Sequence, residues 1–209
     1  MTLDAILALA LFAFVTSITP GPNNIMLLAS GVNFGFRLSI PHLLGISLGF
    51  MLMIALIGLG FSELFDHFPW LHSVLKWCGV IYMLHLSWKI AHSASPISSA
   101  TPESKGPVAS AHPMTFIGAS LFQWVNPKAW AMALSAIVTY VPQVEGHTSM
   151  LHLTMVIGIF GVINLLCVSV WAWAGGRLRN WLGVDHQRRV FNYAMAGLLV
   201  LSLVPMVWD

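Results

Sequence analysis

The sequence Thr19-Pro20-Gly21-Pro22-Asn23-Asn24 lies within residues 5–36, a stretch without a charged residue. A proline inside a helix removes a backbone donor and clashes with the preceding turn. A helix embedded in lipid tolerates this only where protein or a water-lined cavity satisfies the freed carbonyl groups. Breaks of this kind usually lie beside a transport site. The stretch therefore predicts a broken membrane helix.

The composition is that of an integral membrane protein. Of the 209 residues, 57% are hydrophobic and 8% are charged, and the mean hydropathy is +0.81. A helix that spans a bilayer needs about 20 mostly apolar residues. We predict an all-α fold of six transmembrane helices, and we interpret the first as a retained span because it is far longer than a signal-peptide core. The six apolar blocks are residues 5–29, 38–61, 70–91, 114–141, 149–174 and 190–208.

Charged residues divide unequally between the two sides of the predicted membrane. If six helices alternate across it, the loops of one side carry no Lys or Arg, and the acidic residues there are Asp4, Glu63, Asp66, Glu145 and Asp209. The other side carries Arg37, Lys89, Lys105, Arg177, Arg179, Arg188 and Arg189. Basic loops stay in the cytoplasm. Both termini are therefore predicted outside, and the loops 89–113 and 175–189 inside.

The segment 92–113 is rich in Ser and Pro and lacks apolar periodicity, which predicts a flexible cytoplasmic linker. It separates a first three-helix repeat, residues 1–91, from a second, residues 114–209. Because each half has an odd number of spans, the second half crosses the membrane in the opposite sense to the first. This is the arrangement of inverted-repeat transporters.

A second break is predicted at Gln123-Trp124-Val125-Asn126-Pro127-Lys128, near the middle of the fourth block. Thr19-Pro20 and Asn126-Pro127 both suit the N-cap and first position of a helix. A simple proline kink is the alternative at each place. Because the two positions match between the halves, we expect the first and fourth helices each to restart at membrane depth.

Half-helices that begin inside a membrane present free amide groups and a partial positive charge, which suit an anionic ligand. Lys128 adds a full charge at a depth where insertion costs about 3 kcal/mol. The alternative is that Lys128 snorkels to an interface, but about 14 residues, or roughly 20 Å of helix, separate it from either end of its block. We predict a carboxylate site formed by Thr19, Pro20, Gly21, Pro22, Asn23, Asn24, Asn126, Pro127 and Lys128.

The whole chain resembles the lysine-exporter superfamily (LysE/RhtB), and specifically its branch that exports homoserine, threonine and small neutral amino acids. It looks most like the cysteine and O-acetylserine exporters of that branch. The motifs that carry the resemblance are Thr19-Pro20-Gly21-Pro22-Asn23, Gly35-Phe36-Arg37, Gly45-Ile46-Ser47-Leu48-Gly49, Lys76-Trp77-Cys78-Gly79-Val80-Ile81-Tyr82-Met83 and Asn126-Pro127-Lys128.

The resemblance implies a secondary transporter of the bacterial inner membrane that exports small amino acids, and no enzyme. The sequence has no phosphate-binding loop of the Walker type, so a gradient must drive transport. One rival is a thiol-disulfide electron carrier, but Cys78 and Cys167 fall in the third and fifth blocks, whereas such carriers place cysteines in the first and fourth. An uncoupled uniporter or channel of the same architecture is the other alternative.

The resemblance also implies coupling to protons, yet all seven acidic residues fall in loops or at block ends. Proton-coupled transporters usually carry an acidic residue inside the membrane. Two residues are the candidates for proton transfer: His85, in the third block, and Lys128, which would release its proton as the site loses water.

Other polar and small residues are open to two interpretations. Gly45 and Gly49 serve either a homodimer interface or packing within one subunit, and Thr16, Ser17, Ser47 and Asn164 either line a pathway or stabilise helix pairs. The nine His are scattered without metal-ligand spacing. We therefore expect no metal, no cofactor and no nucleic-acid partner. The expected partners are an amino acid, protons and the lipid bilayer.

Overall fold

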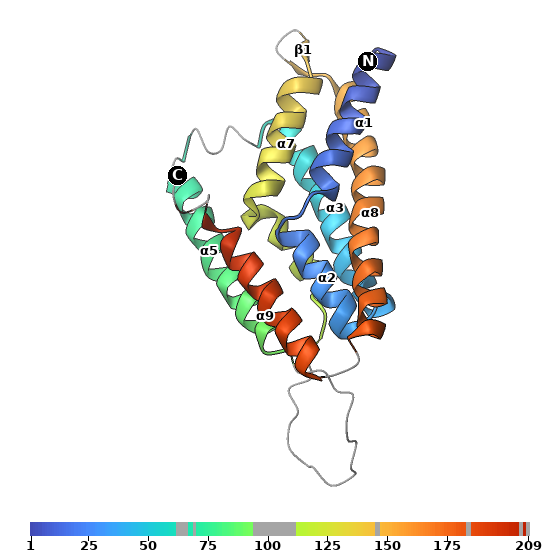
Figure 1. Ribbon diagram of the computed structural model, residues 1–209. Helices are drawn as coiled ribbons and strands as arrows, with labels where there is room; N and C mark the ends of the chain where they lie inside the picture. Colours follow the sequence, from blue (N-terminus) through green and yellow to red (C-terminus); the bar gives the residue numbers. More distant parts are fainter. Residues whose placement is uncertain are drawn as a thin grey trace.

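The computed structural model describes residues 1–61, 67–68, 70–93, 112–144, 147–182, 185–204 and 207, and these form an elongated bundle of helices (Figure 1). Most of the predicted linker, residues 94–111, lies outside the described residues. The elements are α1 (Leu3–Ile18), α2 (Pro22–Phe34), η1 (Arg37–Ser39), α3 (Ile40–Leu56), η2 (Ile57–Phe61), α5 (Trp70–Ala91), α6 (Phe116–Phe122), η3 (Gln123–Val125), α7 (Pro127–Tyr140), β1 (Gln143–Val144), β2 (His147–Thr148), α8 (Met150–Trp181) and α9 (Asp185–Leu201). Of these, η1 and η3 are 3-10 turns and η2 is a π-helical turn.

Each predicted apolar block overlaps one or more of these helices, although α1, α2, α8 and α9 extend beyond the predicted bounds. Within the described residues, the helices Arg37–Phe61 and Met150–Trp181 are each long and apolar enough to cross a membrane. The pair α1 and α2 meets the same criteria if it is taken as one span bent by 55°. Large apolar side chains cover the outside of the bundle, for example Val162, which is 62% exposed, and Val138, which is 83% exposed. A surface of this kind suits contact with lipid.

Helices α1, α2 and α3 all pack against α8. Glycines allow the closest approach. A Cβ atom on Gly31 would collide with the Ala172 carbonyl of α8, and one on Gly175 would collide with the Leu28 carbonyl of α2. The α2–α8 crossing therefore depends on two residues without side chains.

The pair Gly45 and Gly49 serves packing within the chain. A Cβ atom on Gly45 would collide with the Phe116 carbonyl, and one on Gly49 would lie 2.6 Å from the Cα of Ser120. The Ser120 hydroxyl also donates to the Gly45 carbonyl at 3.0 Å. This glycine face of α3 is thus occupied by α6 of the same chain.

Helices α5 and α9 lie side by side along one flank of the bundle, antiparallel to each other (Figure 1). Reciprocal hydrogen bonds of 2.9 and 3.1 Å between the buried amides of Asn33 and Asn192 tie α9 to α2. Asn192 also donates to the Ser93 carbonyl at 3.1 Å. At this end of the bundle α2, α5 and α8 end and α3 and α9 begin. We call it the basic end, because it carries Arg37, Lys89, Arg177, Arg179, Arg188 and Arg189.

Two details differ from the sequence-based expectation. The short strands β1 and β2 form an antiparallel hairpin between α7 and α8, so the described fold is not purely helical. The half-helix after the first break starts later than predicted. Helix α2 begins at Pro22 with Gly21 as its N-cap, and not at Pro20 with Thr19 as its N-cap. Thr19 is the C-cap of α1, and its N–H donates to the Val15 carbonyl.

Candidate functional site

The first break lies between Ile18 and Pro22, where α1 ends and α2 begins at an angle of 55°. Pro22 occupies the first turn of α2, where its missing N–H costs nothing. The N-cap Gly21 has no side chain and so makes no capping hydrogen bond. The start of α2 therefore has no side-chain cap from its own N-cap residue.

Side chains from elsewhere satisfy the carbonyl groups at the end of α1. The Asn24 amide donates to the carbonyls of Ser17 and Thr19, both at 2.8 Å. The indole N–H of Trp171, on α8, donates to the Ile18 carbonyl at 3.0 Å. A membrane-embedded break needs such partners because lipid offers none.

Lys128 completes this set from α7. Its ammonium group donates to the Thr19 carbonyl at 2.8 Å, to the Thr19 hydroxyl at 2.9 Å and to the Pro20 carbonyl at 3.3 Å. A positive charge is favourable here because the last turn of a helix carries a partial negative charge. The lysine side chain also lies directly over Gly21, where a Cβ atom would be 2.8 Å from its Cδ. Gly21 thus provides the space through which Lys128 reaches the first break.

The second break satisfies its own backbone groups locally. Helix α6 continues into the 3-10 turn η3, and α7 begins at Pro127 with Asn126 as its N-cap, as predicted. The Asn126 side chain accepts from the Lys128 N–H at 3.2 Å, and the Trp130 indole donates to the Trp124 carbonyl at 2.8 Å. Every one of these partners lies within a few residues along the chain.

A pair of amides joins the two breaks. Asn23 donates to Gln123 at 2.9 Å, and Gln123 donates back to Asn23 at 3.3 Å. Gln123 is fully buried and also donates to the Ala119 carbonyl at 2.8 Å. The interaction spans 100 residues of sequence, so it fixes the position of one break relative to the other.

A second polar chain runs from α3 through α8 to α1. The Ser47 hydroxyl donates to Asn164 at 3.3 Å, and Asn164 donates to the Ser17 hydroxyl at 3.2 Å. All three side chains are buried. Three of the four polar residues singled out in the sequence therefore lie together beside the first break.

These residues surround a small cavity of about 20 Å³. That is close to the space that a single water molecule occupies, roughly 10–15 Å³ by the same kind of measure. An amino acid does not fit in a space of this size. The lining residues are Thr16, Ser17, Gly21, Asn23, Asn24, Phe50, Gln123, Asn126, Lys128, Ala129, Met132, Asn164 and Val168.

The predicted site residues fall into three groups. Gly21, Asn23, Asn24, Asn126 and Lys128 line the cavity together. Thr19 and Pro20 are exposed and hold the Lys128 ammonium, whereas Pro22 and Pro127 begin the helices α2 and α7. His85 is exposed and lines a different cavity, at the basic end.

Sequence inspection missed the role of Gln123 at the site. It was visible only as part of the motif around Asn126, and its partner Asn23 lies in the other half of the chain. The only signal in the sequence was an amide side chain inside an apolar block, next to the predicted break. The buried His42 was missed in the same way, because it lies in a glycine-rich apolar helix without a sequence partner.

In the described ranges, no three His, Cys, Asp or Glu side chains gather closely enough to hold a metal ion. Cys78 and Cys167 are both free, the first exposed on α5 and the second buried on α8.

Comparison with known proteins assigns the family. The profile of the family described as LysE type translocator matches residues 14–204. The chain is 33% identical over 196 residues to the cysteine/O-acetylserine efflux proteins of Salmonella choleraesuis and Salmonella typhimurium, covering 92% of each chain. It is 32% identical over 207 residues to that of Escherichia coli, covering 98% of each chain. No solved structure matches the chain.

The chain therefore belongs to the LysE family of translocators. It is a multi-pass membrane protein of a transporter family and not an enzyme, as the sequence predicted.

Proposed function

We propose that this protein is a secondary active exporter of small amino acids of the cysteine and O-acetylserine type across the bacterial inner membrane. The observation that carries the proposal is the meeting of two interrupted helices around one polar cavity, with an intramembrane lysine between them. The similarity to cysteine/O-acetylserine efflux proteins over nearly the whole chain supports the substrate class.

Helix contacts support two inverted repeats of three spans, residues 1–91 and 114–209. In two such repeats, taken in chain order, α1, α2, α3 and α5 correspond to α6, α7, α8 and α9. The counterpart of the α1–α8 contact is then the α6–α3 contact, and both are present. The α5–α9 and α3–α8 contacts pair helices with their own counterparts. The α2–α8 crossing is tight at its glycines, whereas its counterpart between α7 and α3 is weak. Alternating access expects such an inequality, because the two repeats exchange conformations during transport.

The hydrogen bonds around the small cavity indicate which contacts must change when a substrate binds. The Lys128 ammonium has Thr19 and Pro20 as its partners, and a substrate carboxylate offers a stronger, charged acceptor. Transfer of the ammonium from these carbonyls to the carboxylate would loosen the end of α1. Separation of the Asn23–Gln123 pair would then free amide groups for the substrate's amino or ester group. Substrate binding is thereby linked to movement at the first break.

Coupling to protons is the remaining part of the proposal. No Asp or Glu occupies the interior of any predicted span, so Lys128 or His85 would carry the proton. Lys128 is the better candidate because it lines the cavity between the breaks, whereas His85 does not. An uncoupled uniporter of the same fold is the alternative.

The orientation follows from the basic end, which we assign to the cytoplasm. Both termini then lie in the periplasm. In a background with Cys78→Ser and Cys167→Ser, an impermeant thiol reagent added to intact cells should label Ser149→Cys and spare Ser99→Cys. The reverse labelling pattern would contradict the orientation. Continued export by that background would also exclude the thiol-disulfide alternative.

Transport by purified protein in proteoliposomes tests the function. We expect uptake of O-acetylserine or cysteine against a gradient when a proton gradient is imposed, and none in vesicles without protein. Movement of substrate without proton flux would replace the exporter with the uniporter. If His85→Gln still moves substrate but loses the proton flux, and Lys128→Gln does not show this uncoupling, the proton passes through His85. Failure to move any of O-acetylserine, cysteine, homoserine and threonine would overturn the proposal.

A further inference from the structure

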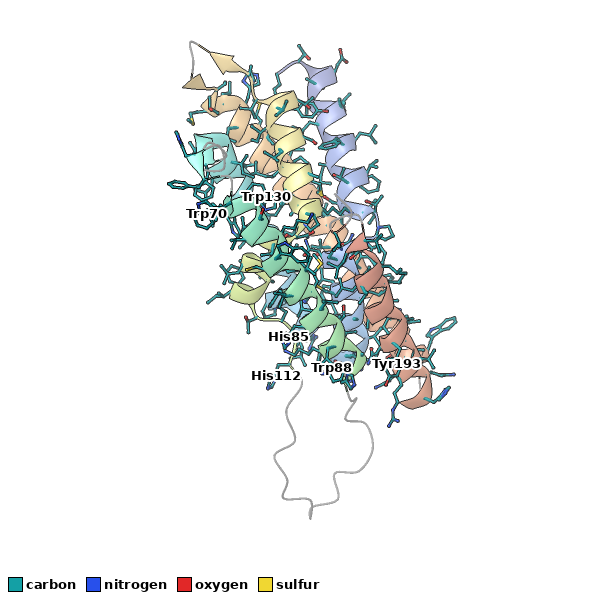
Figure 2. The ribbon with its side chains drawn as sticks, turned by 90° about the vertical axis from the view of Figure 1, so that its left-hand side faces the viewer. Trp70, His85, Trp88, His112, Trp130 and Tyr193 are labelled. Atoms are coloured by element: carbon teal, nitrogen blue, oxygen red, sulfur yellow. The ribbon has the colours of Figure 1, made fainter. Side chains whose placement is uncertain are left out.

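A second and larger cavity lies at the basic end, away from the helix breaks. Its volume is about 280 Å³, compared with about 20 Å³ between the breaks. Helices α2, α3 and α5, the residues that precede α6 and Gly118 of α6 line it. Figure 2 shows two of its lining residues, His85 and His112, next to each other at this end of the molecule.

The polar groups of this cavity are donors or neutral groups. From α2, Met26, Ala29, Ser30 and Asn33 share one helix face, since they are three or four residues apart. Opposite them, α5 contributes Tyr82, His85, Lys89 and Ser93, while His42 comes from α3 and His112 from before α6. Among the described residues, no acidic side chain lines the cavity. Its electrostatic character therefore favours an anion.

His42 is the buried member of this set. Its side chain is 2% exposed, and neither ring nitrogen has a hydrogen-bond partner. A buried polar group without a partner is costly. Such a group in a native structure calls for an explanation, and in the wall of a cavity a ligand can provide the missing hydrogen bonds. A neutral imidazole offers one donor and one acceptor. This matches a zwitterion, which carries an acceptor carboxylate and a donor ammonium.

We propose that this cavity is an entry site that binds a small amino acid from the cytoplasm, with Lys89 and the surrounding His side chains holding its carboxylate. The inference rests on the proposed function and names a second place for the same substrate. A volume of about 280 Å³ is just below the roughly 300–1,000 Å³ of pockets for drug-sized ligands. It therefore suits a molecule of amino-acid size, which the space between the breaks excludes in this conformation.

The entry site and the helix breaks share one helix. Asn23 and Asn24, at the start of α2, line the space between the breaks, and Met26 to Asn33, further along α2, line the entry site. Met26 packs with Phe122, which directly precedes Gln123. Phe122 also lies against Tyr82 of the entry site, with 5.8 Å between ring centroids. A movement of α2 would thus alter both sites together.

Binding of O-acetylserine to full-length protein in lipid nanodiscs tests the entry site. Lys128→Met serves as the background, because it removes the ammonium between the breaks. We expect this variant still to bind O-acetylserine by calorimetry, and added Lys89→Gln to weaken the binding by about tenfold or more, the cost of one charge-assisted hydrogen bond. The control Arg37→Gln removes an exposed charge of the same end that does not line the cavity, and it should change binding less than twofold.

Three results would overturn the entry site. One is the absence of binding to Lys128→Met at O-acetylserine concentrations that saturate wild-type transport. Another is equal binding by Lys89→Gln and Arg37→Gln. The last is equal binding of O-acetylserine methyl ester, which lacks the carboxylate. None of these results bears on transport by the wild-type protein, which tests the proposed exporter function. The entry site and the exporter function can therefore fail independently.

Chemical protection provides a measurement that needs no variant. Diethylpyrocarbonate modifies exposed histidines, and mass spectrometry locates the modified positions. O-acetylserine should protect His85 and His112, and it should leave His186 unprotected because that exposed residue of α9 does not line the cavity. Equal modification of all three with and without O-acetylserine would contradict the entry site. Equal protection by inorganic phosphate would reduce it to a general anion site.

Discussion

The two helix breaks differ in where their hydrogen bonds come from. At the second break, Asn126 caps α7 and the Trp130 indole bonds to the Trp124 carbonyl, and both of these bonds join near neighbours in sequence. At the first break, the Ile18 carbonyl accepts from Trp171 and the Pro20 carbonyl accepts from Lys128, and both donors lie more than 100 residues away. The backbone groups of the second break therefore bond within their own segment, whereas those of the first break also bond to side chains from distant segments.

This difference tells which break can move. A turn whose backbone groups are satisfied locally needs fewer partners from the surrounding helices. The first break changes when Lys128 or Trp171 moves away, because its carbonyl groups then need other partners. We therefore expect the first break to change more than the second when a ligand binds.

The largest effect on stability is expected for Asn24→Leu. This substitution keeps the side-chain size but removes both donors to the end of α1. The Thr19 carbonyl retains Lys128, whereas the buried Ser17 carbonyl loses the partner that Asn24 provides. A buried group left unpaired costs about 2 kcal/mol, so the melting temperature in detergent should fall clearly. A melting temperature equal to that of wild type would show that the first break does not depend on this amide.

A smaller effect is expected for Asn126→Ala at the second break. Loss of an N-cap side chain costs about 1 kcal/mol, and no other bond at that break depends on it in the described structure. The same thermal measurement should therefore place Asn126→Ala between wild type and Asn24→Leu. A larger loss for Asn126→Ala than for Asn24→Leu would reverse the comparison of the two breaks.

The smallest effect is expected for the bond between the breaks. Thermal unfolding of Asn23→Ala, Gln123→Ala and the double variant forms a double-mutant cycle. Interhelical hydrogen bonds in membrane proteins average about 0.6 kcal/mol in such cycles, and we expect a coupling of about that size. Additive effects of the two single substitutions would mean that the amide pair does not hold the breaks together.

The sequence predicted where most of the helices lie because the causes of helix formation are local. Apolar blocks of sufficient length become helices, and Asn126-Pro127 begins a helix as its chemistry requires. Thr19-Pro20 has the same chemistry and failed as a predictor. The Thr19 hydroxyl bonds back to the Thr16 carbonyl and accepts from Lys128, so Thr19 ends α1 instead of starting α2.

The site was predicted only as far as single residues carry their own signal. Lys128 stands out because a charge at membrane depth is costly, and in the structure its ammonium bonds to Thr19 and Pro20. The Asn23–Gln123 pair joins residues 100 positions apart. No local pattern contains such a contact, and the same holds for the buried His42.

The central claim is that Lys128 binds the substrate carboxylate at the first break. Two controls separate this role from structural support. Lys76→Met removes a half-buried lysine of α5, and Thr19→Val removes one hydrogen-bond partner of Lys128 without changing any charge. Folding of all variants is checked by size-exclusion chromatography and thermal unfolding.

The most direct test is the initial rate of O-acetylserine transport by Lys128→Met in proteoliposomes. Loss of a charged hydrogen bond to the substrate should lower the rate by about 100-fold, while Lys76→Met and Thr19→Val retain most of it and Lys128→Arg retains part. Transport by folded Lys128→Met at the wild-type rate would contradict the claim. Equal losses in Lys128→Met and Thr19→Val would show that Lys128 only supports the broken helix.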